Sequence, residues 1–247
     1  MARLTISNPA KRNALDHPIL DAMVVALDGL DARCVVLTGA NDMFSAGYDI
    51  EAISDAEFEQ RAERLVAHPF TESIDALQAY PYPTVAALSG HTIGGGLELA
   101  LACDLRVCAA NIRLGMPPAK LGLVYSHTGL QRFLDAIGAP RTRELFLLGR
   151  HVDAQTALGW GLVNQMVPAQ DLAADALAMA RELAGHAPRA QRGNKRAIGA
   201  LLAARGALDP GLSEELLALR RDSFASQDML EGMRAFAEKR PPRWRDR

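Results

Sequence analysis

The 247-residue sequence has little of what marks several large classes of protein. Its three cysteines all stand within apolar runs, so we interpret them as reduced core residues. A formal charge of −2 gives no electrostatic basis for binding nucleic acid or a membrane surface. No apolar run reaches membrane-spanning length, and the start, MARLTISNPAKR, lacks the apolar stretch of a signal peptide. We expect a cytoplasmic protein with no nucleic-acid or membrane partner.

Familiar catalytic motifs are absent too. The sequence contains no GxSxG nucleophile elbow, no Walker phosphate-binding loop and no GxGxxG dinucleotide motif. Its six histidines are scattered, with no pair at metal-binding spacing, so we assign no metal ligands. The remaining composition, 49% hydrophobic and 23% charged, is that of an ordinary globular protein long enough to bury a large core.

Apolar strands alternate with helices over the first two thirds of the chain. Short apolar runs predict strands at residues 34–38, 84–88, 105–109 and 162–167. Helical spacing predicts helices at residues 16–30, 57–66, 71–79, 130–137, 141–148 and 154–160, and residues 111–129 are rich in loop-forming residues. Strands separated by helices favour parallel pairing through crossover connections, so the predicted class is α/β.

After Pro168 the pattern is helical, and we place a boundary near Pro188. Residues 188–247 interleave arginine and glutamate with leucine and alanine stripes, which suits helices that pack on the core or on another subunit. We therefore predict a core over residues 1–187 and a helical region over residues 188–247.

The most informative stretch is residues 84–104, TVAALSGHTIGGGLELALACD. A strand-like run is followed by three glycines and a helix-like run in which Glu98 is the one ionisable residue. A carboxylate is rarely buried without a partner or a function, and glycines leave backbone N–H groups accessible at a helix N-terminus. Two interpretations stay open on this pattern alone. One is an acid or base beside an oxyanion site; the other is a tight turn with Glu98 solvated in the first helical turn.

A second loop, FSAGYDI at residues 44–50, also follows an apolar strand. Backbone amides from the two loops, converging on one carbonyl oxygen, would make an oxyanion hole. Together these motifs closely resemble the crotonase, or enoyl-CoA hydratase/isomerase, superfamily. Further matches are NPAKRNAL near the start, Cys103-Asp104, residues 154–167 and FAEKRP near the end.

The resemblance covers nearly the whole chain and implies a fold and a substrate. The fold would be a spiral of ββα units with a C-terminal helical trimerisation region, in a homotrimer or a dimer of trimers. The substrate would be an acyl-CoA, with no cofactor beyond the coenzyme A that the substrate carries.

The resemblance also assigns residues. The amides of Tyr48 and Gly95 would hold the thioester carbonyl, and Glu98 would act as the catalytic acid or base. Burial among leucines should raise the pKa of Glu98. The coenzyme A contacts would come from the backbone at Ala46 and Ile50, from Lys11, and from Phe236 and Lys239 in the C-terminal segment of the same or a neighbouring subunit.

One position departs from the pattern of the hydratases, which carry a second glutamate in a GxPE-like segment. Here that segment is GMPP, and Pro118, which has no proton to give, stands where the second acid belongs. Further on, GLVYSHTGLQRF places Tyr125 where hydratases usually have proline, and this portion looks like the methylmalonyl-CoA decarboxylases of the superfamily. Tyr125 could hydrogen-bond a departing carboxylate, or be a half-buried loop aromatic.

Three functions follow from the resemblance. The first is hydration or isomerisation of an enoyl-CoA, the commonest activity, and the second is decarboxylation of a malonyl-type thioester. The third is a non-catalytic acyl-CoA- or RNA-binding relative; the charge and the intact loops with Glu98 argue against it.

Overall fold

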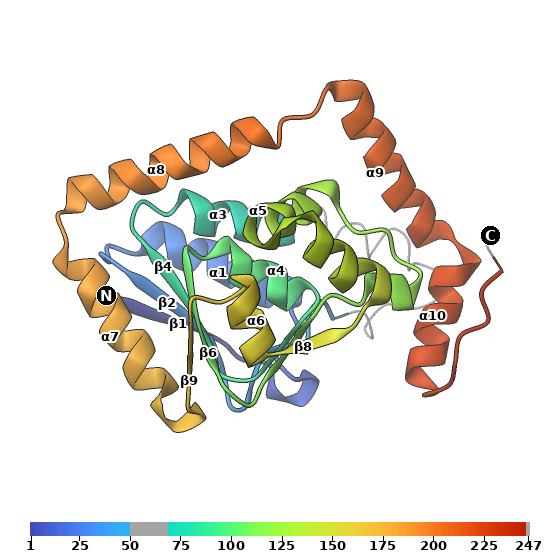
Figure 1. The fold of residues 1–247 in the computed structure, drawn as a ribbon, viewed down its shortest axis with the longest axis horizontal. Helices are drawn as coiled ribbons and strands as arrows, with labels where there is room; N and C mark the ends of the chain where they lie inside the picture. The colour runs from blue at the N-terminus through green and yellow to red at the C-terminus, as the bar shows by residue number, and fades with distance from the viewer. Residues whose placement is uncertain (50–68, 246–247) are drawn as a thin grey trace.

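Two β-sheets form the frame of the molecule in the computed structural model, which describes residues 1–49 and 69–245 (Figure 1). The larger sheet is parallel, and its strands stand in the order β1 (Ala2–Ile6), β2 (Val35–Gly39), β4 (Thr84–Leu88), β6 (Leu105–Ala109) and β9 (Gln165–Val167). The smaller sheet has the order β3 (Met43–Ser45), β5 (His91–Ile93), β7 (Arg113–Gly115) and β8 (His151–Asp153), with only β8 antiparallel.

A repeated corner links the two sheets. Strands β2, β4 and β6 of the larger sheet are each followed by a short strand of the smaller sheet, and after β5 the chain enters helix α4 (Gly95–Ala102). The corner between β4 and β5 is too tight for a side chain, since a Cβ at Gly90 would lie 1.9 Å from the Asp42 carbonyl oxygen. Repeating the corner winds the chain into a spiral, which confirms the predicted α/β class.

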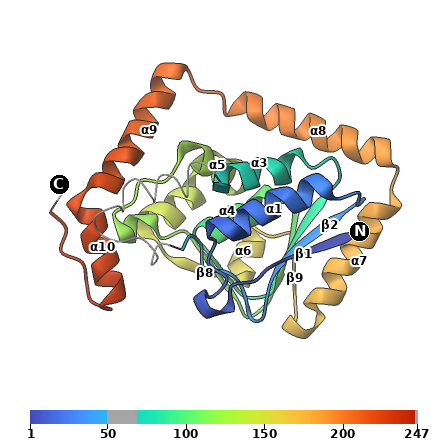
Figure 2. The same cartoon turned by 180° about the vertical axis from the view of Figure 1, so that it is seen from behind.

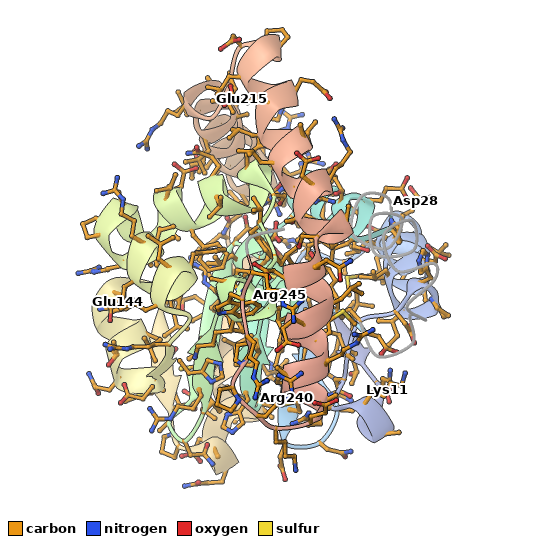
Figure 3. The ribbon with its side chains drawn as sticks, turned by 90° about the vertical axis from the view of Figure 1, so that its right-hand side faces the viewer. Lys11, Asp28, Glu144, Glu215, Arg240 and Arg245 are labelled. Atoms are coloured by element: carbon orange, nitrogen blue, oxygen red, sulfur yellow. The ribbon has the colours of Figure 1, made fainter. Side chains whose placement is uncertain are left out.

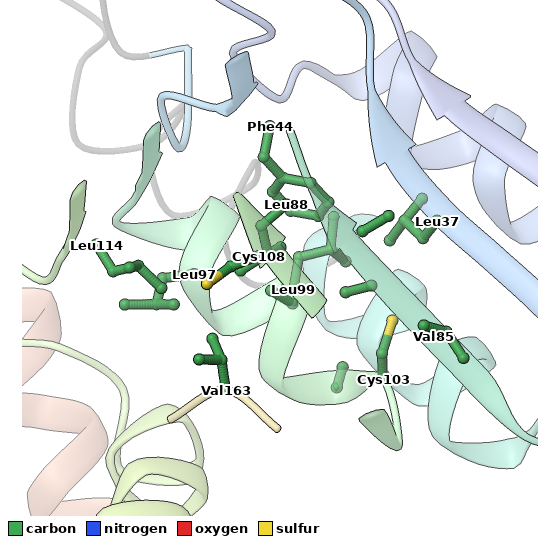
Figure 4. Close-up of a cluster of buried hydrophobic side chains, with 14 of the residues drawn as sticks. Leu37, Phe44, Val85, Leu88, Leu97, Leu99, Cys103, Cys108, Leu114 and Val163 are labelled. Carbon is green, nitrogen blue, oxygen red and sulfur yellow. The ribbon is translucent and has the colours of Figure 1, made fainter. Parts of the chain in front are cut away.

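The core lies where α4 contacts strands of both sheets (Figure 4). Every residue of β4 is buried, as expected for a parallel strand covered on both faces. Leu97 and Leu99 of α4 pack among the apolar side chains of β2, β4 and β6. The cysteines are free and buried in this core, as predicted, and burial raises the pKa of the Cys103 thiol to about 12.

Further helices surround the sheets. They are η1 (Pro9–Lys11), α1 (His17–Gly29), α3 (Thr71–Ala79), η3 (Pro118–Leu121), α5 (His127–Arg143), the π-helix η4 (Glu144–Leu148), α6 (Ala154–Trp160), η5 (Ala169–Asp171) and α7 (Leu172–Gly185). Among the described residues, no helix combines the length and apolarity that a bilayer crossing requires.

The C-terminal helices form an arm around one side of the sheets (Figures 1 and 2). Helix α8 (Pro188–Arg205) contributes no buried residue, whereas α9 (Pro210–Ala225) and α10 (Gln227–Ala237) return to the body, where α10 packs on η3 and α9 on α5. Helix α8 begins at Pro188, and the division into a core and a C-terminal helical region at this residue stays a prediction.

The predicted strands and most predicted helices are present, and the differences are local. The smaller sheet was not predicted, because its strands are three residues long and carry too little alternation to be detected. The segment predicted as a loop, residues 111–129, contains β7 and η3. The predicted strand at 162–167 is shorter, and the predicted helix at 57–66 lies outside the described residues.

Candidate active site

The N-terminal segment NPAKRNAL holds the FSAGYD loop in place. Asn13 is fully buried, and its side-chain amide donates to the carbonyl oxygens of Ala40 at 2.8 Å and Met43 at 2.7 Å. Its Oδ1 accepts a hydrogen bond from the Asn8 N–H at 2.9 Å. One buried amide therefore ties the start of the chain to the strand that leads into the loop.

A parallel bridge to Leu15 then orients the backbone of Tyr48. The Leu15 N–H donates to the Gly47 carbonyl at 2.7 Å, and the Asp49 N–H donates to the Leu15 carbonyl at 2.9 Å. Because the two flanking residues make these bonds, the Tyr48 N–H points to the opposite side. Within residues 1–49 and 69–245 no group accepts a hydrogen bond from it.

The glycine loop approaches from that opposite side. Gly47 has φ 97°, and a Cβ on it would lie 3.3 Å from the Gly95 nitrogen. Gly95 is the first residue of α4, so its N–H is outside the intrahelical ladder, and it too has no acceptor in the described part of the chain. The ring of Tyr48 covers Gly95, where an added Cβ would lie 2.9 Å from two ring carbons. The two loops singled out in the sequence therefore meet.

Glu98, in the first turn of α4, is 2% exposed, which excludes the solvated interpretation. Its Oε2 accepts a 2.5 Å hydrogen bond from the Tyr125 hydroxyl, and its Oε1 accepts one of 3.0 Å from Arg132. Burial raises the pKa of Glu98, as predicted, although Arg132, Tyr125 and Arg220 each act to lower it.

Tyr125 directly precedes Ser126, the N-cap of α5, and is 8% exposed. Its ring lies against the first turn of α5, where a Cβ on Gly129 would approach both Tyr125 (2.6 Å) and the Oε1 of Glu98 (3.0 Å). The phenols of Tyr48 and Tyr125 influence each other, and burial raises the pKa of both. Tyr125 and Glu98 thus form a hydrogen-bonded pair where the two loops meet.

Two cations at this site were not predicted. Arg132, on α5, pairs with Glu98, while its buried Nε has no hydrogen-bond partner among the described residues. Arg220, on α9, is 8% exposed, and its charge lowers the pKa of Glu98. Both segments are predicted to be helical, but spacing along one helix does not reveal which side chain meets a distant carboxylate.

The segment GMPP, where the resemblance places the second acid of hydratases, carries no acidic side chain. Pro118 begins η3 and is buried, so no carboxylate enters the site from that segment. The carboxylate of Asp49, close in sequence to Tyr48, is paired with Lys11 at 2.7 Å. Among the described residues, no cluster of three or more His, Cys, Asp or Glu side chains could hold a metal ion.

The described residues predicted to contact coenzyme A lie in two separate parts of the structure, around the FSAGYD loop and near the end of α10. Ala46 lies in the FSAGYD loop, and its N–H donates a hydrogen bond to the Arg12 carbonyl oxygen at 3.1 Å. Phe236 is 62% exposed and lines a hollow of about 330 Å³ with Lys120, Arg240 and Trp244, whereas Lys239 is exposed at the end of α10. Figure 3 shows Lys11 and Arg240 from the side on which α9 and α10 lie. Ile50 lies outside the described residues.

The spiral fold and the meeting of the two loops agree with a comparison across known families. The model of the enoyl-CoA hydratase/isomerase family matches residues 1–247. The chain belongs to this family.

Individual members of the hydratase/isomerase family match over almost the whole chain. A probable enoyl-CoA hydratase (echA8) of Mycobacterium bovis is 36% identical over 251 residues, which cover 99% of this chain and 94% of the relative. A putative enoyl-CoA hydratase of Thermus thermophilus is 36% identical over 255 residues, covering 99% and 97%. A solved methylmalonyl-CoA decarboxylase in complex with 2-nitronate-propionyl-CoA superposes with a TM-score of 0.90 at 27% identity, covering 99% and 95%. The protein is therefore an enzyme of the enoyl-CoA hydratase/isomerase type.

Proposed function

We propose that the protein decarboxylates a malonyl-type coenzyme A thioester through a thioester enolate. The observation that carries the proposal is the partner of Glu98, which is the Tyr125 hydroxyl rather than a second carboxylate. Hydration with two carboxylates needs one to orient the water and another to give a proton. Pro118 stands where the resemblance places the second carboxylate, so this mechanism lacks one of its acids. The structural likeness to methylmalonyl-CoA decarboxylase supports the same choice.

The enolate would be stabilised by the backbone. The thioester carbonyl accepts hydrogen bonds from the N–H groups of Tyr48 and Gly95, both without an acceptor in the described part of the chain. When the bond between the α-carbon and the carboxylate breaks, carbon dioxide leaves and the electron pair moves onto this carbonyl oxygen. Removing one such donor typically costs about 2.7–4 kcal/mol of transition-state stabilisation.

The proton that completes the reaction would come from the hydrogen-bonded pair of Glu98 and Tyr125. Glu98 is protonated over a wider pH range than an exposed glutamate because burial raises its pKa. It passes a proton, directly or through Tyr125, to the α-carbon of the enolate. Loss of carbon dioxide followed by proton uptake is redox-neutral, so the proposal needs no redox cofactor.

Hydration of an enoyl-CoA is the second candidate. It is favoured by the names of the relatives that share 36% identity, both of which are described as enoyl-CoA hydratases. In that reaction Glu98 alone would orient and activate the water, and its ionised form would be the active one.

Two substrates assayed side by side separate the candidates. Crotonyl-CoA is followed by loss of its conjugated absorbance, and methylmalonyl-CoA by release of carbon dioxide. We expect release of carbon dioxide with little change in crotonyl-CoA. Hydration without decarboxylation would overturn the proposal and show that Pro118 is tolerated by a hydratase.

A further inference from the structure

One cation at the site, Arg220, has no acidic partner among the described residues. Arg220 belongs to the C-terminal arm, yet it is 8% exposed, and its guanidinium lies 5.8 Å from the centre of the Phe224 ring. Helix α9 is fixed against the loop of Tyr125, because the Val124 N–H donates to the Ser223 hydroxyl at 3.0 Å. Arg220 therefore reaches the active site from a segment that the family motifs do not include.

Other buried or half-buried cations of the protein have polar partners. Arg106 donates to the carbonyl oxygens of Leu162 and Cys103, and Lys195 pairs with Asp104 at 2.8 Å. Within the described residues, the guanidinium of Arg220 has neither an ion pair nor a hydrogen bond. Burying a cation without a partner is unfavourable, so we expect a buried cation of this kind where an anionic ligand supplies the missing partner.

Arg220 lies one helical turn before Ser223, whose hydroxyl accepts the hydrogen bond from Val124 beside Tyr125. The charge of Arg220 lowers the pKa of both Glu98 and Tyr48. Each buried carboxylate of the described site already has a cation, since Glu98 is bonded to Arg132 and Asp49 to Lys11. The described site thus has one cation more than carboxylates, and a substrate anion would balance Arg220.

We infer that Arg220 determines substrate specificity by binding a carboxylate on the acyl group, so the substrates are acyl-CoA thioesters that carry a second acid. The inference rests on the proposed acyl-CoA function and holds for decarboxylation or hydration. A guanidinium can bind a carboxylate through two parallel hydrogen bonds, which an unsubstituted acyl chain cannot accept. The phosphates of coenzyme A are a poor alternative, because the long pantetheine chain separates them from the thioester.

Binding of matched thioesters tests the inference. Succinyl-CoA and butyryl-CoA have acyl chains of equal length and differ by one carboxylate, as do malonyl-CoA and propionyl-CoA. By calorimetry, we expect the wild type to bind the acidic member of at least one pair about tenfold more tightly or better. Arg220→Met should remove this preference by weakening the acidic member alone, and Arg220→Lys should keep part of it.

The neighbouring Arg221→Met is the matched control. Arg221 has the same charge and lies one position along α9, but its side chain is 43% exposed and pairs with Glu214 at 2.6 Å. We expect it to retain the preference, and thermal unfolding verifies that each variant folds. The inference is overturned if the wild type shows no preference in either pair, or if Arg220→Met weakens both members equally. Failure of the wild type to bind any of the four thioesters would overturn the proposed function as well.

Discussion

The Tyr125 hydroxyl donates a 2.5 Å hydrogen bond to Glu98 Oε2 while Arg132 binds the other oxygen of the same carboxyl group at 3.0 Å. The group is therefore held at both oxygens, in a place where burial raises its pKa. Its pKa is the balance between desolvation, which raises it, and the two partners, which lower it. Several measurable consequences follow from this balance.

Glu98→Gln should lower turnover about tenfold or more and leave acyl-CoA affinity nearly unchanged, because the amide keeps the shape of the carboxyl group but cannot transfer its proton. Steady-state kinetics and calorimetry give the two quantities. Glu182→Gln, on the exposed face of α7, is the control and should behave as the wild type. Comparable turnover in the Glu98 variant would remove this residue from the mechanism.

Tyr125→Phe should move the pH profile in a defined direction. In the proposed decarboxylation Glu98 acts as an acid, so kcat/KM falls as the pH rises through its pKa. The hydrogen bond from Tyr125 lowers the pKa of Glu98, so its loss raises that pKa and shifts the alkaline limb to higher pH. Tyr82→Phe, at a tyrosine that packs under Arg192, should leave the limb in place. An unshifted limb, or one moved to lower pH, contradicts the assignment.

Gly95→Pro tests the amide at the start of α4. Proline is tolerated at the first position of a helix and removes only the N–H there, so the helix should form while one oxyanion donor is lost. Gly95→Ala is the matched control, since its Cβ meets the Tyr48 ring in the same way but its N–H remains. We expect kcat of the proline variant to be about 100-fold or more below that of the alanine variant. Equal rates would show that the Gly95 amide does not hold the thioester.

The stability of the protein relative to Glu98→Gln should depend on pH. The folded state raises the pKa of Glu98, so it binds this proton more tightly than the unfolded chain does. The stabilisation is therefore complete below the ordinary glutamate pKa and is lost as the pH rises through the raised one. Groups such as Glu231, whose pKa Arg240 lowers to about 2, are common to both proteins and cancel.

Urea unfolding of the two proteins from about pH 5 to about pH 8 measures this difference. We expect the free energy of unfolding of the wild type to fall relative to that of the variant as the pH rises. A difference that grows with pH would mean that Arg132 and Tyr125 outweigh burial.

Helix α8 bears on assembly. It has no buried residue, although Ile198 and Leu201 are 59% and 68% exposed, and we propose that a second copy of the chain covers it in a trimer. Native mass spectrometry should give three times the chain mass of 26.6 kDa, or twice that for paired trimers. Ile198→Glu with Leu201→Glu should dissociate the assembly, whereas Val25→Glu, at a 72% exposed position of α1, should not. A wild type that is monomeric would contradict the proposal.

Much of the candidate site could be predicted from contiguous segments. The glycine loop and Glu98 lie within one run of residues. Glu98 stands between two leucines on a helix, so it is buried unless the whole helix is exposed. The FSAGYD loop follows a buried strand in the same way as the glycine loop, so topology alone predicts that the two loops are near each other. The short strands of the smaller sheet could not be predicted, because three residues carry no periodicity.

The sequence by itself determined the α/β class, the parallel strands, the two loops and the one acid in the apolar run after the glycines, because apolar periodicity and turn chemistry are local properties of the chain. Only the tertiary structure decided the surroundings of that acid. Arg132 and Arg220 come from two helices that no sequence pattern pairs with Glu98, and the resemblance that singled out Tyr125 does not show that its hydroxyl binds the Glu98 carboxyl group. Their meeting depends on how α5 and α9 pack, and burial at that contact sets the charge and proton affinity on which the chemistry depends.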